Sequence, residues 1–496
     1  MRRGDDARNL ARMTSSVHSR TGDAPRALRC AALAGAALAA ALVPLTAGAQ
    51  DRPPRTRWET QARALLEELT EINTTHSVGD SHAAAEAMAT RMREAGWPAE
   101  DVIVVKNADR KGNLIVRYRG RNRTRKPILL LSHLDVVEAD PKDWTLPPFE
   151  FIERDGVFYG RGVADDKDEG AIHLTILLRM RAEGYVPDRD IIVALTADEE
   201  GGPANGVDFI LRNRPELFAN VEFGFNEGGG GRIEEGKKVS NDVQASEKKV
   251  ANFTIEATNP GGHSSVPRPD NAIYQLSAAL SRIGTYHFPV RLNEVTREYF
   301  RRQASLVGPE TGAAMRRLVA DERDSAAAAV IAKDPANNSR MRTTCVATML
   351  TGGHAENALP QRATATVNCR ILPDETTESV RDRLITAVND TGVKVTVKRG
   401  AADSPPSPLE ASLLRMMEQT TQELWPGMPV VPTMSTGATD SRFLRNAGVP
   451  VYGISGLFYD NPNAHGMNEH VSAQAFYDGL EFMYRLVRKV TAGPGM

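Results

Sequence analysis

Carboxylates and histidines recur directly after apolar runs of the sequence. His133 follows the run PILLLS, Glu199 and Glu200 follow DIIVALT, and Glu227 follows a strand predicted at 221–225. Open α/β sheets bind ligands at the carboxyl ends of their strands, so we expect these side chains to meet at one edge of a sheet. Imidazole and carboxylate groups together suit zinc or a related divalent ion.

Two further candidates precede a helix and follow the last strand. Asp165 and Asp166 lie between GRG and a helix predicted from about Asp168, and His465 lies in the segment NAHGMNE. Each motif alone has a structural explanation, because paired carboxylates also cap helices and a lone histidine is more often structural. The joint occurrence of two histidines and at least three carboxylates is more specific, since a shared carboxylate can hold two metal ions about 3.5–4 Å apart.

Alternating helices and apolar strands must position these residues. Continuous apolar runs predict buried strands at 127–132, 190–196, 221–225 and 449–454, and helical spacing predicts helices at 58–72, 81–95 and 168–184. Apolar runs bounded by helices are typical of a parallel sheet that is buried on both faces. We therefore predict an α/β fold with a mostly parallel mixed sheet flanked by helices.

A different pattern interrupts this domain. From Glu247 to about residue 400 the sequence predicts the strands and helices of a separate α+β unit, and SPPSP at 404–408 marks the return to the first pattern. The predicted organisation is a catalytic domain in two parts, 50–246 and 401–496, with an inserted lid or dimerisation domain at 247–400.

Two cysteines, Cys345 and Cys369, lie on strands that we predict to be antiparallel, at 341–351 and 362–371. A symmetric pairing of these strands places the cysteines opposite each other, so a cross-strand disulfide and two buried thiols are both open. Two cysteines are too few for a disulfide framework. Neither has the sequence pattern of a catalytic nucleophile.

Residues 1–49 predict a signal peptide. Arg26 and Arg29 precede an apolar run at 30–45 and the small residues Ala47-Gly48-Ala49. Cleavage near Ala49 would leave a periplasmic or secreted protein. An uncleaved anchor is the less favoured alternative, because the run is shorter than the roughly 20 residues of a membrane span.

The composition is that of a globular protein, with 496 residues of which 41% are hydrophobic and 25% charged. Its 61 basic and 63 acidic side chains give a net charge of −2 without a polybasic block. We therefore expect neither nucleic acid nor a membrane surface as a stable partner.

A series of motifs resembles one family of enzymes. In order along the chain they are SHLDVV, YGRGVADDKD, TADEEGG, NEGGG, NPGGHSSVP, GGHAENALP, NCRILP, TGATDSRF and AHGMNE. They resemble the co-catalytic zinc peptidases that include aminoacylase, glutamate carboxypeptidase, acetylornithine deacetylase, succinyl-diaminopimelate desuccinylase and yeast carboxypeptidase S. The long polar stretch at 295–332 makes the chain more similar to the carboxypeptidase S branch.

The resemblance implies two divalent metal ions, with zinc as the first choice and cobalt or manganese as alternatives. It implies His133 and Glu227 on one metal, Glu200 and His465 on the other, Asp165 as the bridge, Asp135 as the residue that orients His133, and Glu199 as the general base. In the family the peptide bond after the bridging aspartate is typically cis.

The resemblance also assigns roles to residues around the substrate. His263 and Asn357 match groups that contact the scissile carbonyl, and Arg370 and Arg442 match positions that bind the substrate carboxylate. A homodimer through the inserted domain is implied as well, in which His263 would serve the partner's site.

The leading hypothesis is an exported di-zinc metallopeptidase that cleaves the amide bond next to a carboxylate-bearing residue, as a carboxypeptidase or dipeptidase acting on a small peptide. An N-acyl-amino-acid deacylase is the first alternative, because it uses the same machinery. A related aminopeptidase would lack the inserted domain, and a non-catalytic exported binding protein would be expected to lack a ligand or the base.

Overall fold

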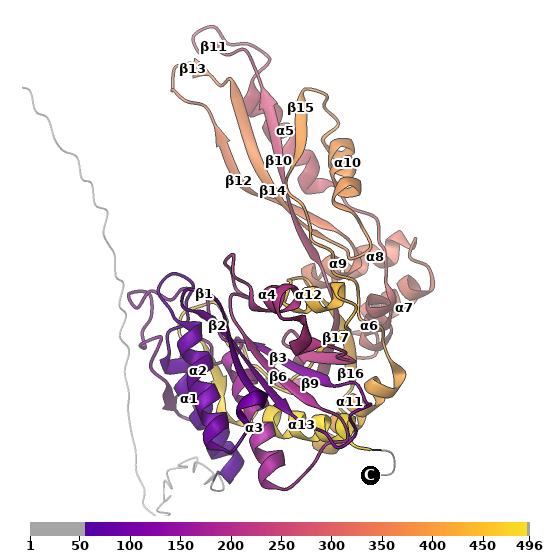
Figure 1. Ribbon diagram of the computed structural model, residues 1–496. Coiled ribbons are helices and arrows are strands. Elements are labelled where there is room, and N and C mark those ends of the chain that lie inside the picture. Colours follow the sequence, from indigo (N-terminus) through magenta and orange to yellow (C-terminus); the bar gives the residue numbers. More distant parts are fainter. Residues whose placement is uncertain (1–54, 494–496) are drawn as a thin grey trace, which may run out of the picture. The chain divides into compact units, whose positions relative to one another are not determined.

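The computed structural model describes residues 55–493 (Figure 1). The signal peptide predicted for residues 1–49 lies outside this range and stays a prediction. Within the described range, no helix is both long enough and apolar enough to cross a bilayer.

The central sheet is mixed and has nine strands, in the order β1-β2-β6-β3-β7-β17-β9-β16 with β8 paired to β9. Strand β3 runs parallel to both β6 and β7, and β17 runs parallel to β7. The mostly parallel mixed sheet predicted from the sequence is therefore confirmed. Its strands are β1 (Val102–Ala108), β2 (Lys111–Tyr118), β3 (Ile128–His133), β6 (Ile191–Thr196), β7 (Phe223–Asn226), β8 (Gly230–Glu234), β9 (Lys237–Glu247), β16 (Val430–Ser435) and β17 (Val451–Gly453).

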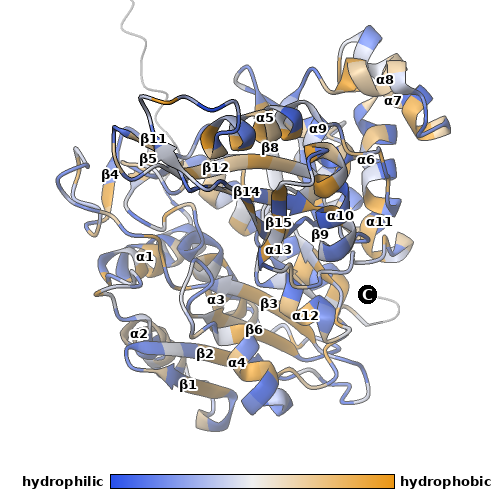
Figure 2. Cartoon of the chain, turned by 90° about the horizontal axis from the view of Figure 1, so that it is seen from above, coloured by the Kyte–Doolittle hydropathy of each residue, from blue (hydrophilic) through white to orange (hydrophobic). Residues whose placement is uncertain are grey.

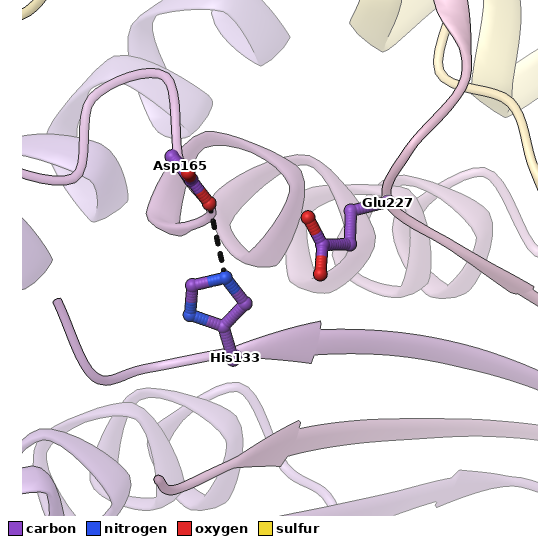
Figure 3. Close-up of side chains that lie close together, drawn as sticks. All are labelled: His133, Asp165 and Glu227. Atoms are coloured by element: carbon purple, nitrogen blue, oxygen red, sulfur yellow. Dashed lines mark hydrogen bonds and ion pairs between the residues drawn. The ribbon is translucent and has the colours of Figure 1, made fainter. Parts of the chain in front are cut away.

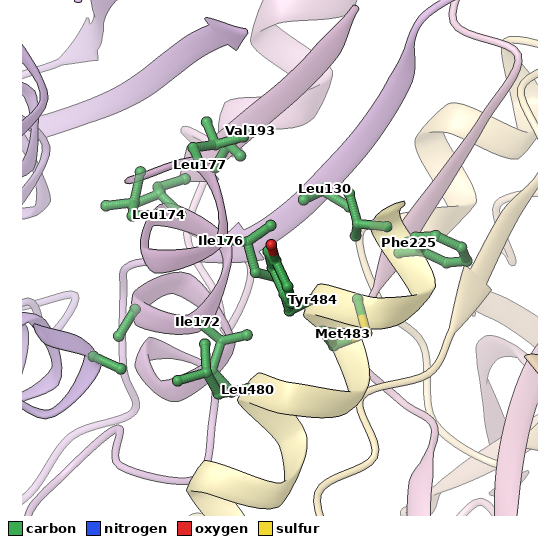
Figure 4. Packing of buried hydrophobic residues seen from close by; sticks show 14 of the residues in the cluster. Leu130, Ile172, Leu174, Ile176, Leu177, Val193, Phe225, Leu480, Met483 and Tyr484 are labelled. Carbon is green, nitrogen blue, oxygen red and sulfur yellow. The ribbon is translucent and has the colours of Figure 1, made fainter. Parts of the chain in front are cut away.

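Helices cover both faces of this sheet, which explains why β3 and β6 are buried along their whole length and are mostly hydrophobic (Figure 2). Leu130 and Val193 pack with α3 and α13 on one face (Figure 4), whereas Leu129 and Ile192 pack with α4 and α12 on the other. Successive strand residues point to opposite faces, so a strand buried on both sides needs no polar position. The first face holds α1 (Arg57–Glu71), α2 (Ser81–Glu94), α3 (Lys167–Ala182), α11 (Ala411–Leu424) and α13 (Ala473–Thr491), and the second holds α4 (Gly206–Asn213) and α12 (Ser441–Asn446).

A separate antiparallel sheet has the order β12-β14-β10-β15 and its own hydrophobic core under α5 and α10. Its strands are β10 (Lys249–Thr258), β12 (Thr344–Gly352), β14 (Arg362–Ile371) and β15 (Val393–Arg399), and its helices are α5 (Ala272–Thr285) and α10 (Thr377–Val388). The predicted α+β character of this region is confirmed, while the domain boundaries stay predictions.

The cysteine register follows the symmetric pairing expected from the sequence. Cys345 of β12 lies opposite Cys369 of β14, and the two form a disulfide with a Cα–Cα distance of 4.1 Å. Of the two alternatives left open by the sequence, the structure contains the disulfide.

The polar stretch after α5 folds as four short helices with a core of their own. Phe300, Met315 and Leu318 belong to this core, which packs against Val431 of the central sheet. The helices are α6 (Glu294–Gln303), α7 (Pro309–Ala320), α8 (Ser325–Ile331) and α9 (Pro335–Met341). We refer to α6–α9 as the helical insertion.

The remaining elements are small. A three-stranded sheet contains β4 (Ile152–Arg154), β5 (Val157–Tyr159) and β18 (His470–Ser472), and a two-stranded sheet contains β11 (Gly262–His263) and β13 (Ala358–Leu359). Two short 3-10 helices span Ala99–Asp101 and Pro215–Phe218.

Candidate metal centre

Four of the five predicted metal ligands lie at or after the carboxyl ends of parallel strands of the central sheet. His133 is the last residue of β3, Glu200 lies in the loop after β6, and Glu227 directly follows β7. Asp165 precedes α3, and His465 lies in the loop between β17 and β18. The shared direction of these strands brings residues that are far apart in the sequence to one edge, as an open α/β sheet requires.

Five ligand side chains form two groups that share one aspartate. His133, Asp165 and Glu227 make the first group (Figure 3), and Asp165, Glu200 and His465 the second, with the ligand atoms of each group within 4.8 Å of one another. Nε2 of His133 lies 3.1 Å from Oδ1 of Asp165, and Nε2 of His465 lies 3.1 Å from Oδ2. Asp165 thus offers one oxygen to each group, as a bridging carboxylate does.

The chemistry of the donor set fits two divalent cations. Carboxylates of Asp165, Glu199, Glu200 and Glu227 converge here, and within residues 55–493 none of them forms an ion pair with a lysine or an arginine. Burial and the neighbouring charge of Glu199 raise the pKa of Glu227, which reports an uncompensated concentration of negative charge. Bound cations would provide the missing compensation.

Hydrogen bonds between Asp165 and its imidazole neighbours shift the pKa values of these groups in opposite directions. Burial alone would raise the pKa of Asp165, but hydrogen bonds with His133 and His465 hold it far below its ordinary value. Hydrogen bonds with Asp165 and Glu200 raise the pKa of the more exposed His465 to about 10. Without a metal, the site therefore holds a proton where a ligand nitrogen is needed.

Asp135 serves the site through both its main chain and its side chain. Nδ1 of His133 lies 2.9 Å from the main-chain carbonyl of Asp135, which leaves Nε2 turned toward Asp165. The carboxylate of Asp135 lies farther from that imidazole, at 3.8 Å, and accepts the main-chain N–H groups of Glu199 and Glu200 at 3.0 Å each. Asp135 thus orients His133 and also fixes the loop that carries the two glutamates.

Glu199 belongs to neither ligand group and so is available for proton transfer. Burial, together with the charge of Asp440, raises its pKa well above that of an exposed glutamate. Its neighbour Asp198 is fully buried and lies 2.8 Å from Nζ of Lys111, which anchors the start of the loop.

A buried ion pair that the sequence analysis did not predict supports the loop that leads to Asp165. Nη1 of Arg161 lies 2.6 Å from Oε2 of Glu469, and both side chains are at most 2% exposed. The other carboxylate oxygen of Glu469 accepts the N–H groups of Gly162 and Ala164 at 3.1 and 2.9 Å. Arg161 and Glu469 both lie in motifs that carry the family resemblance, and no other feature of the sequence indicates this pair.

The peptide bond between Asp165 and Asp166 is cis, as the resemblance implies. The carboxylate of Asp166 accepts the main-chain N–H of His133 at 3.1 Å. The residue after the bridge thereby ties the start of α3 to the end of β3.

His263 and Asn357 lie next to each other in the small β11–β13 sheet. His263 pairs with Ala358, and the carbonyl of Asn357 accepts the N–H of Ser264 at 2.9 Å. Both side chains are exposed, and none of the hydrogen bonds or ion pairs in the described chain joins them to the metal ligands. Their roles at the scissile carbonyl stay predictions.

The two predicted carboxylate-binding arginines flank the loop that precedes α12. Nη1 of Arg370 lies 3.5 Å from the carbonyl of Thr436, and Arg442 follows in α12. Within the part of the chain that the structure describes, neither arginine has an acidic partner in an ion pair, and Nε of Arg442 is buried without a hydrogen bond. Both guanidinium groups are therefore available to an external carboxylate.

A cleft of about 530 Å³ opens beside the metal ligands. Asp165, Glu227, Thr436 and Arg340 line it, together with the glycine run 228–231. A side chain at Gly228, which has φ +98°, would place its Cβ 1.6 Å from Gln244, so this wall of the cleft must be bare main chain. The cleft is the natural place for a substrate.

A family model described as peptidase family M20/M25/M40 matches residues 129–489. The chain belongs to this family. It is therefore a metal-dependent hydrolase of the exopeptidase and amidohydrolase type, as the sequence predicted.

Relatives of two kinds share most of the chain. The human N-fatty-acyl-amino acid synthase/hydrolase PM20D1 is 30% identical over 395 residues, which cover 75% of each chain. A probable carboxypeptidase S-like 2 protein of Dictyostelium discoideum is 28% identical over 399 residues, which cover 76% of this chain and 74% of that one. The crystal structure of an M20 family metallo-carboxypeptidase from Sulfolobus solfataricus superposes with a TM-score of 0.64 at 17% identity, covering 86% of this chain and 98% of that chain, so it supports the fold.

We predict that Glu469→Ala destabilises this M20 hydrolase. Removal of one partner leaves the buried Arg161 uncompensated, which typically lowers the free energy of unfolding by about 3–5 kcal/mol. It also frees the loop that leads to Asp165, so metal affinity should fall. Denaturant unfolding of the metal-free protein and metal content after dialysis measure the two effects. The exposed Glu150→Ala is the matched control, and equal stability of the two variants would contradict this role of Glu469.

We predict that metal uptake releases a proton from His465. With its pKa raised to about 10, this imidazole is protonated at neutral pH, and it must lose the proton to become a ligand. Apparent affinity should therefore rise with pH below 10, by about tenfold per unit for each proton released. Calorimetric zinc titrations in two buffers of different ionisation enthalpy count the protons. His465→Ala should release fewer protons and lose one bound metal, and the exposed His354→Ala should behave as the wild type. Identical heats in the two buffers would refute the prediction.

Proposed function

We propose that the protein is an exported di-zinc exopeptidase that cleaves an amide bond next to a carboxylate-bearing residue, as a carboxypeptidase or dipeptidase. The observation that carries the proposal is the placement of Asp165 between two imidazoles, with Glu199 nearby and without an ion-pair partner in residues 55–493. Zinc is the ion best suited to two imidazoles and three carboxylates, and cobalt and manganese fit the same donors.

Two metal ions bound by these residues would polarise the scissile carbonyl and acidify the attacking water. Glu199 accepts a proton from that water and then delivers it to the leaving amine nitrogen. Its raised pKa, due to burial and to Asp440, suits a group that must take up a proton near neutral pH. The hydrogen bond from the Glu199 N–H to Asp135 keeps the main chain of the base fixed during both transfers.

Arg370 and Arg442 provide recognition of the substrate carboxylate. A guanidinium without an acidic partner binds a carboxylate more strongly than a neutral donor does. Arg370 contacts Thr436, and Thr436 also lines the cleft beside Asp165. This arrangement supports an exopeptidase, because only the terminal residue of a peptide carries a free main-chain carboxylate.

We also propose a homodimer through the inserted domain, in which His263 and Asn357 would stabilise the oxyanion of the partner's substrate. Strand β12 lies at the edge of its sheet, and Val346, Met349 and Leu350 are 58–64% exposed on it. An edge strand with large exposed apolar residues is typical of an interaction surface.

Export is supported by the predicted signal peptide and by the disulfide, which persists in oxidising compartments.

An N-acyl-amino-acid deacylase is the second candidate. Its substrate also carries a free carboxylate beside the scissile amide, and the printed name of the human relative describes hydrolysis of an N-fatty-acyl amino acid. The two candidates differ only in the group on the acyl side of the bond.

We predict that activity requires both metal and a free substrate carboxylate. Protein stripped of metal and reconstituted with zinc, cobalt or manganese is assayed for amino acid release from dipeptides, N-acyl amino acids and their C-terminally amidated counterparts. Arg370→Gln and Arg442→Gln should raise KM for the acids by about ten- to a hundredfold, since a charge-assisted hydrogen bond contributes about 1.5–3 kcal/mol. Neither should further lower the weak turnover of the amides, and Arg415→Gln, at an exposed position of α11, is the control. Equal turnover of acids and amides by the wild type would refute carboxylate recognition.

We predict that Glu199→Gln retains both metals and loses turnover. The amide keeps the shape of the side chain but cannot accept a proton, so kcat should fall by about 10²–10⁴ while KM changes little. Metal content is measured on the same samples as the rate. The exposed Glu235→Gln should be fully active, and a Glu199→Gln variant with near-normal kcat would exclude Glu199 as the base.

A further inference from the structure

The helical insertion contains a cavity that shares no lining residue with the metal cleft. It has a volume of about 470 Å³, within the range of small-molecule sites. One wall is the segment 287–290 after α5, the opposite wall is α8, and Arg342 lies between α9 and β12. Nothing in the proposed peptidase mechanism uses this space.

The walls of the cavity are largely apolar. Ala328, Ala329 and Ala332 face it from α8 and its C-terminal end, and Phe288 and Val290 line the other side. The side chains of the three alanines end at Cβ, so they leave room that larger residues would fill. Figure 2 shows the hydrophobic character of α8.

A buried cation lies at this apolar surface without a counter-ion. Arg342 is about 9% exposed, and its Nη1 donates to the carbonyl of Phe288 at 3.1 Å. Its Nε is buried without a hydrogen-bond partner, and the bond from Nη1 is the only hydrogen bond of this guanidinium within residues 55–493. No carboxylate of the described chain forms an ion pair with this guanidinium.

Glu322, whose carboxylate belongs to the cavity lining, does not serve as the counter-ion of Arg342. Glu322 lines the cavity, but it pairs with Arg297 and accepts the main-chain N–H of Leu292 at 3.1 Å. A buried charge that is neither paired nor fully hydrogen-bonded is unfavourable in the folded state. An anion from outside the chain would remove that penalty.

We propose that this cavity binds a monocarboxylate with an apolar chain, such as a medium-chain fatty acid. The carboxylate pairs with the guanidinium of Arg342, and the chain lies along the alanines of α8. A guanidinium alone would also accept inorganic phosphate, but the apolar walls favour a ligand with one charge and a hydrocarbon tail. The proposal is independent of which amide the enzyme hydrolyses.

The test is calorimetric titration of octanoate into the zinc-loaded full chain and its variants. Ala329→Leu fills the cavity from an exposed helix position that tolerates leucine, and Arg342→Gln removes the charge. Each should raise Kd for octanoate at least about tenfold, a loss of about 1.4 kcal/mol. Ala326→Leu, at an exposed position of the same helix outside the cavity, should leave Kd unchanged. If Arg342→Gln fails to fold, Ala329→Leu alone decides.

Three further ligands test the contribution of the apolar chain and that of the charge separately. Octan-1-ol has the chain without the charge, whereas acetate and inorganic phosphate have the charge without the chain, and all three should bind at least about tenfold more weakly. Absence of octanoate binding, unchanged binding in Ala329→Leu, or equal binding of octanol or phosphate would each overturn the proposal. If octanoate bound only in the metal cleft, Ala329→Leu would bind it with the same Kd as the wild type, and the proposal would be overturned.

Discussion

Mutual repulsion of partly buried carboxylates is the constraint on which the rest of this structure depends. Asp165, Glu199, Glu200 and Glu227 meet at the edge of the central sheet, and two imidazoles are the only cationic groups that pair with any of them in the described chain. Left to itself, such a cluster would spread apart or take up protons. It is useful because the same concentration of negative charge binds divalent cations tightly.

The loops that carry these side chains must stay in place despite the repulsion. Their main-chain N–H groups are held by hydrogen bonds to other carboxylates. Asp135 holds the N–H groups of Glu199 and Glu200, and Glu469 holds those of Gly162 and Ala164. Glu247, at the end of β9, accepts hydrogen bonds from Ser404 and from the N–H of Thr439. In each case a carboxylate from a distant segment fixes a loop, so the positions of the ligands are set by the packing of the whole sheet.

The sequence predicted what depends on local pattern, and the structure adds what depends on long-range contacts. Apolar runs predicted the buried strands because burial on both faces removes polar positions, and strand symmetry placed Cys345 opposite Cys369. The ligand set was implied by motif resemblance, and the structure brings those residues together. Neither source indicated that Asp135 would use its carbonyl toward His133, or that Arg161 would pair with Glu469. The Arg161–Glu469 pair joins segments that are 308 residues apart in the sequence, and no periodicity records such a contact.

The chain at the end of the helical insertion lines two separate cavities. Arg340 lines the metal cleft, and Arg342, two residues later, lines the separate cavity beside α8. Nζ of Lys248 donates to the carbonyl of Arg342 at 2.7 Å, and the N–H of Lys248 donates to the carbonyl of Ser435 in the central sheet. Because Lys248 lies where the chain passes from β9 to β10, the segment that carries both arginines is tied to the connection between the two sheets.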